Sequence, residues 1–538
     1  MTSDPFAPTP DRVPARPRIL KLPRQRALAL SGALAVLGLV AAACGGGDGG
    51  GTTAQTGTGG STAAVAEAAT SSEFMSTRPG AGIAAAGGNL QAIRGGDNPC
   101  EQPGGDEPIF ISYVGISLAE LDALGLEAIE VEEPGLIIEA YTNEVNFNGG
   151  INGRCVEFVN HLWSLADPAG TIAQICTDLV TRRPVVHLTL RVSDATLDCA
   201  TIGSQLPTIG VYAFAPASTF DRTGDRLFID DGSVERLLST SLELALSSNV
   251  ISANDRVGLL HGISDMAESV AIVRSFGFED VPAAHVPAEF SDVQLLLQEK
   301  QVRLLASGLT DDEQMEAQRN LAALPPELAG LYGEMEQFFL DAANRFKDAG
   351  VTAVAATADW TDMRRMIRAA ELVDWTPTWV ANDIQPATVV LADVPTRQAE
   401  NLVLISNRRA AGDPVPELDQ GCVTLRNTAV AAEPFSHRLH TDAWTFITAI
   451  CDYLDVSFGA MTRIQGEVNP DTFAAALKDT HYDTQYGGLI TFSSADLSGA
   501  ERFRVLKADP ACVLNFWGCM RSTTDWMLPA NTAGLAAG

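Results

Sequence analysis

Polar and aromatic residues follow the β-rich runs of this sequence at the points where those runs end. Tyr113 lies near the end of the first run, and Ser117 lies just beyond it. Ligands of open α/β sheets bind outside the carboxyl ends of the strands. The other residues in such positions are Ser193, Tyr212, Phe214, His261, Asp359, Trp360 and Asp383. Together these nine residues are the candidate binding set for a small polar molecule.

Three of these residues have an equally ordinary structural explanation. Ser193 stands just before a helix expected near Thr196, where a serine caps a helix as readily as it binds a ligand. Asp359 fits the cap of a helix from Thr361 in the same way. Trp360 could close over a ligand, but tryptophan at a strand end packs in the core at least as often.

The sequence gives no pattern for catalysis or metal binding. It contains no nucleophile elbow, zinc-protease motif or phosphate-binding loop. Its histidines are scattered, and the closest two, His437 and His440, precede a helix and have no ligating neighbours. We therefore expect no enzyme activity, no cofactor and no metal.

The elements that must position the binding set alternate between strand and helix. Ile109 to Val114 is a strand candidate, Pro134 opens a helix, and the pattern continues to a turn-rich break at 215–231. It restarts with the strand Val257 to His261. This order predicts an α/β protein with parallel sheets covered on both faces. Residues 298–333 are charged and helical, which suggests an insertion.

The N-terminus has the pattern of an export signal. Six Lys and Arg residues between Arg12 and Arg26 precede an apolar run, Leu28 to Val40, that is too short to span a bilayer comfortably. Small residues then lead to Cys44, as in the signals of bacterial lipoproteins, where the cysteine is acylated. An ordinary secretory signal with an incidental cysteine is the alternative, and both predict export.

Composition indicates a role for the segment after the signal and limits the classes of molecule that the chain can bind. Residues 45–105 are rich in Gly, Ala, Ser and Thr, so they cannot bury enough apolar surface to fold. We expect them to form a flexible tether. The rest of the chain is long enough for two domain-sized cores. The net charge of −31 excludes nucleic acid as a partner, because an acidic surface repels phosphates.

Eight cysteines remain after Cys44, an even number in an exported chain, so disulfides are favoured over thiols. The number alone permits many connectivities. Short loops favour Cys176–Cys199, Cys422–Cys451 and Cys512–Cys519, which leaves Cys100–Cys155.

Several segments together resemble the type I periplasmic binding proteins, in particular the branched-chain amino acid group of ABC-transporter substrate-binding proteins. The segments that carry the resemblance are Ala140 to Asn146, Gly149 to Arg154, Cys176 to Val180 with Cys199, Ala349 to Val354, and Trp375 to Trp379. The resemblance covers residues 107–520.

The resemblance implies two Rossmann-like lobes joined by three crossovers that act as a hinge. It implies a cell-envelope lipoprotein on the outer face of the cytoplasmic membrane that delivers a small ligand to an ABC-transporter permease. A ligand-sensing receptor of the same fold without a transporter is the alternative. The expected division is a signal at 1–43, a tether at 44–105, an N-terminal lobe at 106–220 with 405–485, a C-terminal lobe at 221–404 with 486–522, and a tail at 523–538.

The resemblance also implies roles for individual residues. Ser193, with Tyr212, would hold a ligand carboxylate from the N-terminal lobe. Asp383 matches the position where amino-acid binders carry a carboxylate for the ligand ammonium. The ligand expected from this is an amino acid or a similar small polar solute.

Overall fold

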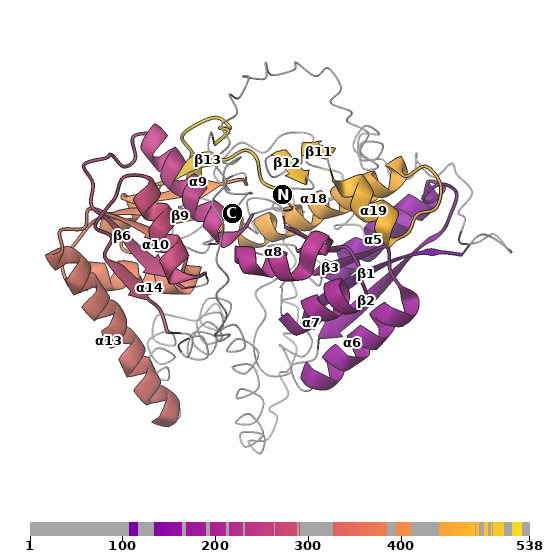
Figure 1. Ribbon diagram of the computed structural model, residues 1–538, viewed down its shortest axis with the longest axis horizontal. Helices are drawn as coiled ribbons and strands as arrows, with labels where there is room; N and C mark the ends of the chain where they lie inside the picture. Colours follow the sequence, from indigo (N-terminus) through magenta and orange to yellow (C-terminus); the bar gives the residue numbers. More distant parts are fainter. Residues whose placement is uncertain are drawn as a thin grey trace, which may run out of the picture.

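Two β-sheets, each covered by helices, form two lobes that lie side by side in the computed structural model of the chain (Figure 1). The structure describes residues 100, 107–116, 134–163, 168–189, 194–210, 215–229, 232–262, 264–287, 290, 326–384, 394–408, 410, 441–478, 480–483, 489–492, 497, 499–509 and 519–529.

The sheet of the first lobe has five strands, all parallel. Their order is β2 (Val156–Trp163), β1 (Ile109–Ile116), β3 (Val186–Thr189), β4 (Thr208–Gly210) and β5 (Leu227–Ile229). Short strands such as β3 and β5 are buried along their whole length. That burial is typical of parallel sheets, because helices cover both faces.

Helices from distant parts of the sequence cover the first sheet. On one face, α5 (Pro134–Phe147) packs with α18 (Thr441–Arg463) and α19 (Pro470–Leu477), and Tyr141 of α5 donates a hydrogen bond to Asp455 of α18. On the other face lie α6 (Pro168–Arg182), α7 (Asp194–Asp198) and the π-helix η3 (Cys199–Gly203). The short helices α8 (Ala217–Thr223) and η4 (Gly224–Arg226) lead into β5.

The sheet of the second lobe has seven strands, five of them parallel. Their order is β14 (Cys519–Ser522), β13 (Arg504–Asp509), β10 (Leu402–Ser406), β9 (Thr378–Asn382), β8 (Ala353–Ala356), β6 (Val257–His261) and β7 (Ala283–His285), with β13 and β14 antiparallel at one edge. A separate pair, β11 (Thr480–Asp483) and β12 (Leu489–Phe492), packs against the core of the first lobe.

Alternate residues of the second sheet face different helices. Val257 and Leu259 of β6 pack with Ala353 and Ala355 of β8 against α9 (Val234–Ser247) and α10 (Met266–Ser275). Leu260 and the intervening residues of β8 pack against α13 (Pro326–Asp348) and α14 (Trp360–Leu372). A short helix, α16 (Thr396–Ala399), precedes β10.

The helix starts follow from side-chain caps. Ser233 accepts a hydrogen bond from the N–H of Arg236 at the start of α9, and Asp265 accepts one from Glu268 at the start of α10. In α19, Asn469 and Thr472 form a reciprocal capping box. Such oxygens satisfy backbone N–H groups that have no partner inside the helix.

Going by the described helices and strands, the chain passes between the lobes three times. It leaves the first sheet between Ile229 and α9, returns between β10 and α18, and leaves again between Phe492 and β13. The first and third passages, predicted from the sequence at 220 and 485, both lie later in the chain. β5 still pairs with β4 in the first sheet, and β12 still packs in the first core, because their few residues are apolar and buried there.

Two of these passages are hydrogen-bonded to each other. The N–H of Gly499 donates to the carbonyl of Ile229 at 2.7 Å, and the N–H of Ile229 donates to Leu497 at 3.1 Å. Next to them, the side chain of Arg236 donates to the carbonyl of Ala500. The first and third passages are therefore paired at these residues.

Most of the strands and helices expected from periodicity are present, and their bounds differ by a few residues. Asn148 to Gly150 ends α5 as expected, since Gly149 and Gly150 adopt the positive φ angles that glycine tolerates best. The insertion expected at 298–333 is wrong in its last eight residues, because residues 326–333 are the first turns of α13. Residues 298–325 lie outside the described part of the chain.

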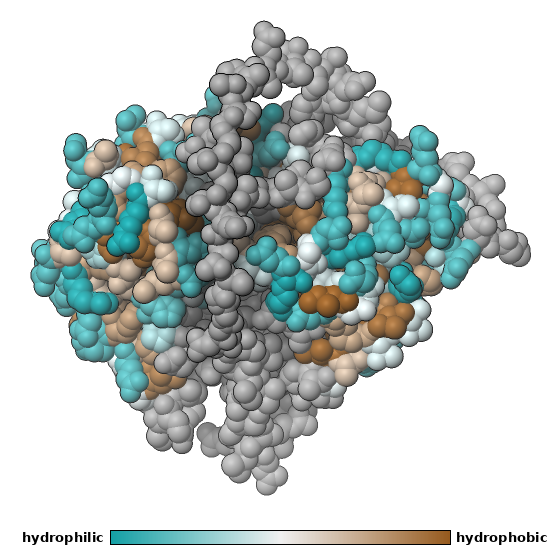
Figure 2. Space-filling view, viewed as in Figure 1, coloured by the Kyte–Doolittle hydropathy of each residue, from teal (hydrophilic) through white to brown (hydrophobic). Residues whose placement is uncertain are grey.

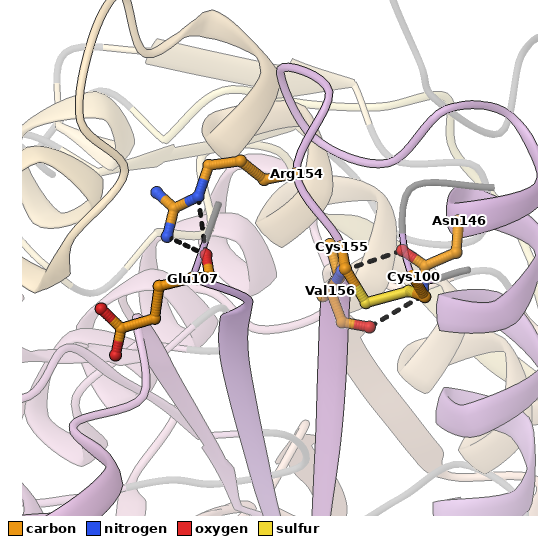
Figure 3. The surroundings of a disulfide bond; sticks show 6 residues. All are labelled: Cys100, Glu107, Asn146, Arg154, Cys155 and Val156. Carbon is orange, nitrogen blue, oxygen red and sulfur yellow. Dashed lines mark hydrogen bonds between the residues drawn. A yellow bond between two sulfur atoms is a disulfide. The ribbon is translucent and has the colours of Figure 1, made fainter. Parts of the chain in front are cut away.

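Figure 3 shows how a disulfide fixes the start of the first sheet. Cys100 is bonded to Cys155, immediately before β2. Beside it, the amide of Asn146 brackets Val156, accepting from its N–H at 2.9 Å and donating to its carbonyl at 2.8 Å. The guanidinium of Arg154 donates to the carbonyl of Glu107 at 2.6 Å and 2.9 Å.

A second disulfide, Cys176–Cys199, joins α6 to η3. Both bonds are pairs expected from the sequence. Cys451 is also in a disulfide. Cys422 and Cys512, from the other two expected pairs, lie outside the described residues, as does Cys44.

On the face drawn in Figure 2, hydrophilic and hydrophobic residues are interspersed over both lobes. Exposed apolar side chains include Val180 of α6 and Leu372 of α14. Within the described ranges, no helix combines the length and apolar character that a bilayer crossing requires.

Gly499 has no room for a side chain, and this yields a stability prediction. A Cβ at this position would lie 2.5 Å from Cγ2 of Ile490 and 2.6 Å from Cε1 of Phe492. Gly499→Ala should lower the free energy of unfolding by about 1–3 kcal/mol, the usual cost of overpacking, as measured by urea denaturation. Gly333→Ala in α13 is the control, because no atom lies within 4 Å and the helix should gain about 1 kcal/mol. Equal stability of both variants would contradict the packing argument.

A buried histidine in the first lobe makes stability depend on pH. His187 of β3 shares a 2.8 Å hydrogen bond with Ser112 of β1, and burial, followed by the nearby His161, lowers its pKa from 6.5 to about 3. The folded state thus resists a proton that the unfolded chain accepts below pH 6.5. Its contribution to stability is complete above pH 6.5 and is lost as the pH falls toward 3.

We expect the loss through His187 to reach about 3 kcal/mol by pH 4.5. His187→Asn retains a partner for Ser112 but does not titrate, so its free energy of unfolding should fall less steeply between pH 6.5 and pH 4.5. Urea denaturation across this range, with both proteins at each pH, measures the two slopes. Parallel slopes would show that His187 is not the group responsible.

Candidate functional site

Four parallel strands of the second sheet end in polar residues at the same edge. His261 ends β6, Thr357 follows β8, Asn382 ends β9, and Ser406 ends β10. All four side chains are buried. Because parallel strands point the same way, this row lies along the carboxyl edge, where open α/β sheets bind ligands.

His261 is paired with a second histidine on the next strand. It lies in register with His285 of β7, and the two Nδ1 atoms are 2.7 Å apart. Burial is the main cause that lowers the pKa of His261, followed by the charge of His285. Smaller effects raise the pKa of His261: hydrogen bonds with the backbone of Ser264 and Asp265, and the negative charge of the Asp265 carboxylate. His261 is therefore neutral near pH 7.

Thr357 extends the ladder of β8 by one residue, since its N–H donates to the carbonyl of Leu260 at 2.9 Å. Its side chain lies on the same face as Ala353 and Ala355, toward α9 and α10, and His261 shares this face. Within the described part of the chain, neither Oγ1 of Thr357 nor Nε2 of His261 has a hydrogen-bond partner. Thr357 was not among the site residues predicted from the sequence, although its place as the last residue of the strand predicted at 351–357 was a usable signal.

Asp383 is almost fully buried, and both of its carboxylate oxygens accept hydrogen bonds. One accepts from the hydroxyl of Ser406 and the other from the N–H of Asn407 at 2.8 Å. Asn382, beside it, accepts from the N–H of Ile384 at 3.0 Å. The carboxylate is thus held in one orientation by the turn after β10. Ser406 and Asn407 were not among the predicted site residues, although they directly follow the strand predicted at Leu402 to Ile405.

Asp359 caps a helix, which is the structural alternative to a ligand role that its sequence position also suggested. Its carboxylate accepts the N–H of Asp362 at 3.0 Å at the start of α14. Trp360 is the first residue of that helix, and its side chain lies outside the described part of the structure.

In the first lobe, one predicted residue is described. Tyr113 of β1 is buried, and its ring lies over Gly115 two residues later, where a Cβ would come within 2.8 Å of the phenolic oxygen. Thr189 is buried at the end of β3. The predicted residues outside the described ranges are Ser117, Ser193, Tyr212 and Phe214.

A buried acid joins the two lobes next to this edge. Glu235, in the first turn of α9, accepts the N–H of Ala217 at 2.8 Å, at the start of α8 in the first lobe. Burial is the main cause that raises the pKa of Glu235, and Glu268 of α10 adds to it. The carboxylate links the lobes through a backbone amide.

In the described ranges, no cluster of three or more histidine, cysteine, aspartate or glutamate side chains is placed to hold a metal ion. The row along the second sheet supplies hydroxyl, imidazole, amide and carboxylate groups. These groups can hydrogen-bond a small molecule, and Asp383 can also offset a positive charge.

No protein-family model and no curated protein matches the sequence. Solved structures do match the fold. A branched-chain amino acid ABC-transporter protein of Thermus thermophilus with bound valine is 14% identical, with a TM-score of 0.50, covering 80% of this chain and 100% of its own. A possible leucine/isoleucine/valine-binding protein of Rhodopirellula baltica is 13% identical, with a TM-score of 0.50, covering 79% and 98%.

A third match is a solute-binding protein of an ABC transporter from R. palustris, in complex with 4-hydroxybenzoate. It is 12% identical, with a TM-score of 0.50, and the match covers 80% of this chain and 100% of the other. Likeness at this identity concerns the fold. The chain has the two-lobed α/β fold of the type I periplasmic binding proteins, as the resemblance in the sequence implied.

Proposed function

We propose that this chain is an extracytoplasmic solute-binding lipoprotein that captures a small polar ligand, an amino acid or similar, between its two lobes and delivers it to an ABC transporter. The proposal includes acylation at Cys44, attachment to the outer face of the cytoplasmic membrane, and contact with a permease. It assigns no catalytic activity to the chain.

The observation that carries the proposal is the row of buried polar groups at the carboxyl edge of the second sheet, from His261 to Ser406. Buried polar atoms without a hydrogen-bond partner disfavour the fold, and Nε2 of His261 and Oγ1 of Thr357 have none among the described residues. The pairing of the first and third passages at Ile229 and Gly499 supports a hinge, because a change in the angle between the lobes can be absorbed where two connections lie together.

The solved structures with this fold add chemical guidance for the ligand. Valine is bound to the Thermus thermophilus protein and 4-hydroxybenzoate to the R. palustris protein. Both molecules are small and carry a carboxylate. A carboxylate-bearing solute is accordingly our first choice for tests on this chain.

The direct test is calorimetry of the full mature chain with valine, leucine and 4-hydroxybenzoate, together with small-angle scattering. We expect one ligand per chain and a smaller radius of gyration when ligand is present, because contacts from both lobes favour the closed state. Binding of none of these solutes, with no change in the radius, would contradict the proposed function.

For individual residues, we propose that Ser193 and Tyr212 bind the ligand from the first lobe and that Asp383 pairs with an ammonium from the second. The hydrogen bonds from Ser406 and Asn407 support this role for Asp383, because they orient its carboxylate before a ligand arrives.

Asp383→Asn should weaken valine or leucine binding by about 2–5 kcal/mol, because the ligand ammonium would lose its counter-charge in a desolvated site. Asparagine keeps the size of the side chain and an oxygen for the N–H of Asn407, so calorimetry can be read without a large structural change. 4-Hydroxybenzoate, which has no amine, should not lose affinity. Asp280→Asn, at a side chain that is 79% exposed, is the control. Unchanged amino acid affinity in Asp383→Asn would remove the ammonium role.

A further inference from the structure

We propose that the outer edge of β2 pairs with β2 of a second copy of this chain, antiparallel and centred on Asn160, so that the first sheets of the two copies join. This inference goes beyond the proposed function, because it concerns the side of the first lobe and not the carboxyl edges of the sheets. Its tests need no ligand, so their outcome is independent of solute binding.

Alternate residues of β2 direct their backbone groups away from the sheet. β2 is the end strand of the first sheet, and β1 is its partner among the described strands. The N–H of Ile109 donates to the carbonyl of Cys155 at 2.8 Å, so Cys155 and every second residue after it face β1. The residues between them, whose N–H and carbonyl groups face outward, are Val156, Phe158, Asn160 and Leu162.

The protein itself satisfies the first of these four positions. The side-chain amide of Asn146 accepts from the N–H of Val156 at 2.9 Å and donates to its carbonyl at 2.8 Å (Figure 3). An antiparallel neighbour would make the same two bonds. No described residue does so at Phe158, Asn160 or Leu162. The open part of the edge therefore begins at Phe158.

β2 lacks the features that usually protect an edge strand. Protected edges are short, bulged, or carry lysine or proline. β2 has eight residues, matches β1 residue for residue, and contains neither lysine nor proline. Leu162 is 38% exposed. At the start of α5, where Gly135 packs against Asn160, Leu136 is 42% exposed. The edge thus presents both backbone groups and apolar side chains.

The sequence of β2 favours a second copy as the partner. Antiparallel pairing about Asn160 places that residue opposite itself and Phe158 opposite Leu162, and each such pair exchanges two hydrogen bonds. Phe158 and Leu162 lie on the same face of the sheet, so the pairing brings apolar side chains together. Glu157, the one charged residue of a carboxylate or ammonium type in the strand, lies opposite Trp163. No acid therefore faces another acid.

The bounds of the open edge select this register. Two-fold centres just before Asn160 place an open position opposite Val156, whose backbone groups are already bonded to Asn146. Centres after Asn160 place Phe158 opposite residues beyond the end of β2. Pairing centred on Asn160 is the register in which all three open positions are paired.

The first test is sedimentation equilibrium of the full mature chain, unacylated at Cys44, from about 1 to about 100 μM. We expect the average mass to rise with concentration toward that of a dimer, since a short interface binds weakly. The net charge of −31 opposes association, so the dimer fraction should increase with salt. A monomer under all these conditions, as expected if β2 pairs with a strand of a different protein, would overturn the proposal.

The second test blocks the edge. Asn160→Pro removes an outward N–H and leaves the ladder to β1 intact, because an edge strand tolerates proline where its N–H faces solvent. Leu162→Lys adds the charge that protects other edges. Both variants should dimerise at least about tenfold more weakly, with little change in melting temperature. Leu372→Lys in α14, at a side chain that is 78% exposed, is the control of equal charge and should dimerise like the wild type. Wild-type dimerisation of both edge variants would contradict the pairing.

The third test measures the register with a short bismaleimide crosslinker. In the proposed pairing the two copies of residue 160 are about 5.5 Å apart at Cα. The two copies of residue 157 are roughly 20 Å apart, because six residues of strand separate them. Asn160→Cys should therefore crosslink into dimers, and Glu157→Cys, also at an exposed position, should not. Equal crosslinking of the two variants, or a dimer in which neither crosslinks, would rule out pairing about Asn160.

Discussion

Parallel strand pairing is the constraint on which the rest of this structure depends. Parallel neighbours need a crossover between them, so each strand of the two sheets is reached through a helix or another long connection that covers a face. The strands consequently bury both faces, which is why Val257 to His261 is buried at every position. The same pairing sends the carboxyl ends of the parallel strands to one edge of each sheet. Polar residues far apart in the sequence, such as His261 and Ser406, therefore meet there.

The three passages of the chain determine how the lobes are joined. Each lobe is built from separate segments, as α18 shows by packing against the first sheet after the chain has already formed most of the second. Adjacent residues of α9 then tie the passages together: Glu235 reaches Ala217 of the first lobe, and Arg236 reaches Ala500 of the third passage. A change in the angle between the lobes has to be absorbed close to these contacts.

The polar groups of the candidate site differ in how completely the protein satisfies them. The carboxylates of Asp359 and Asp383 accept backbone N–H groups, so they stabilise a helix start and a turn whether or not a ligand is present. His261 and Thr357 each retain a buried polar atom with no partner among the described residues. Groups of the second kind cost stability in the empty protein and gain most from a ligand, since binding removes that penalty.

The sequence by itself determined the fold class and most elements, because apolar periodicity and turn residues act locally: the strand Val257 to His261 and the end of α5 at Asn148 to Gly150 were predicted where they lie. It also predicted the disulfides Cys100–Cys155 and Cys176–Cys199. Tertiary structure decided what depends on neighbours distant in sequence. The three residues of β5 form a strand only beside β4. His261 meets His285 only because β6 and β7 pair in register, and no local pattern encodes that contact.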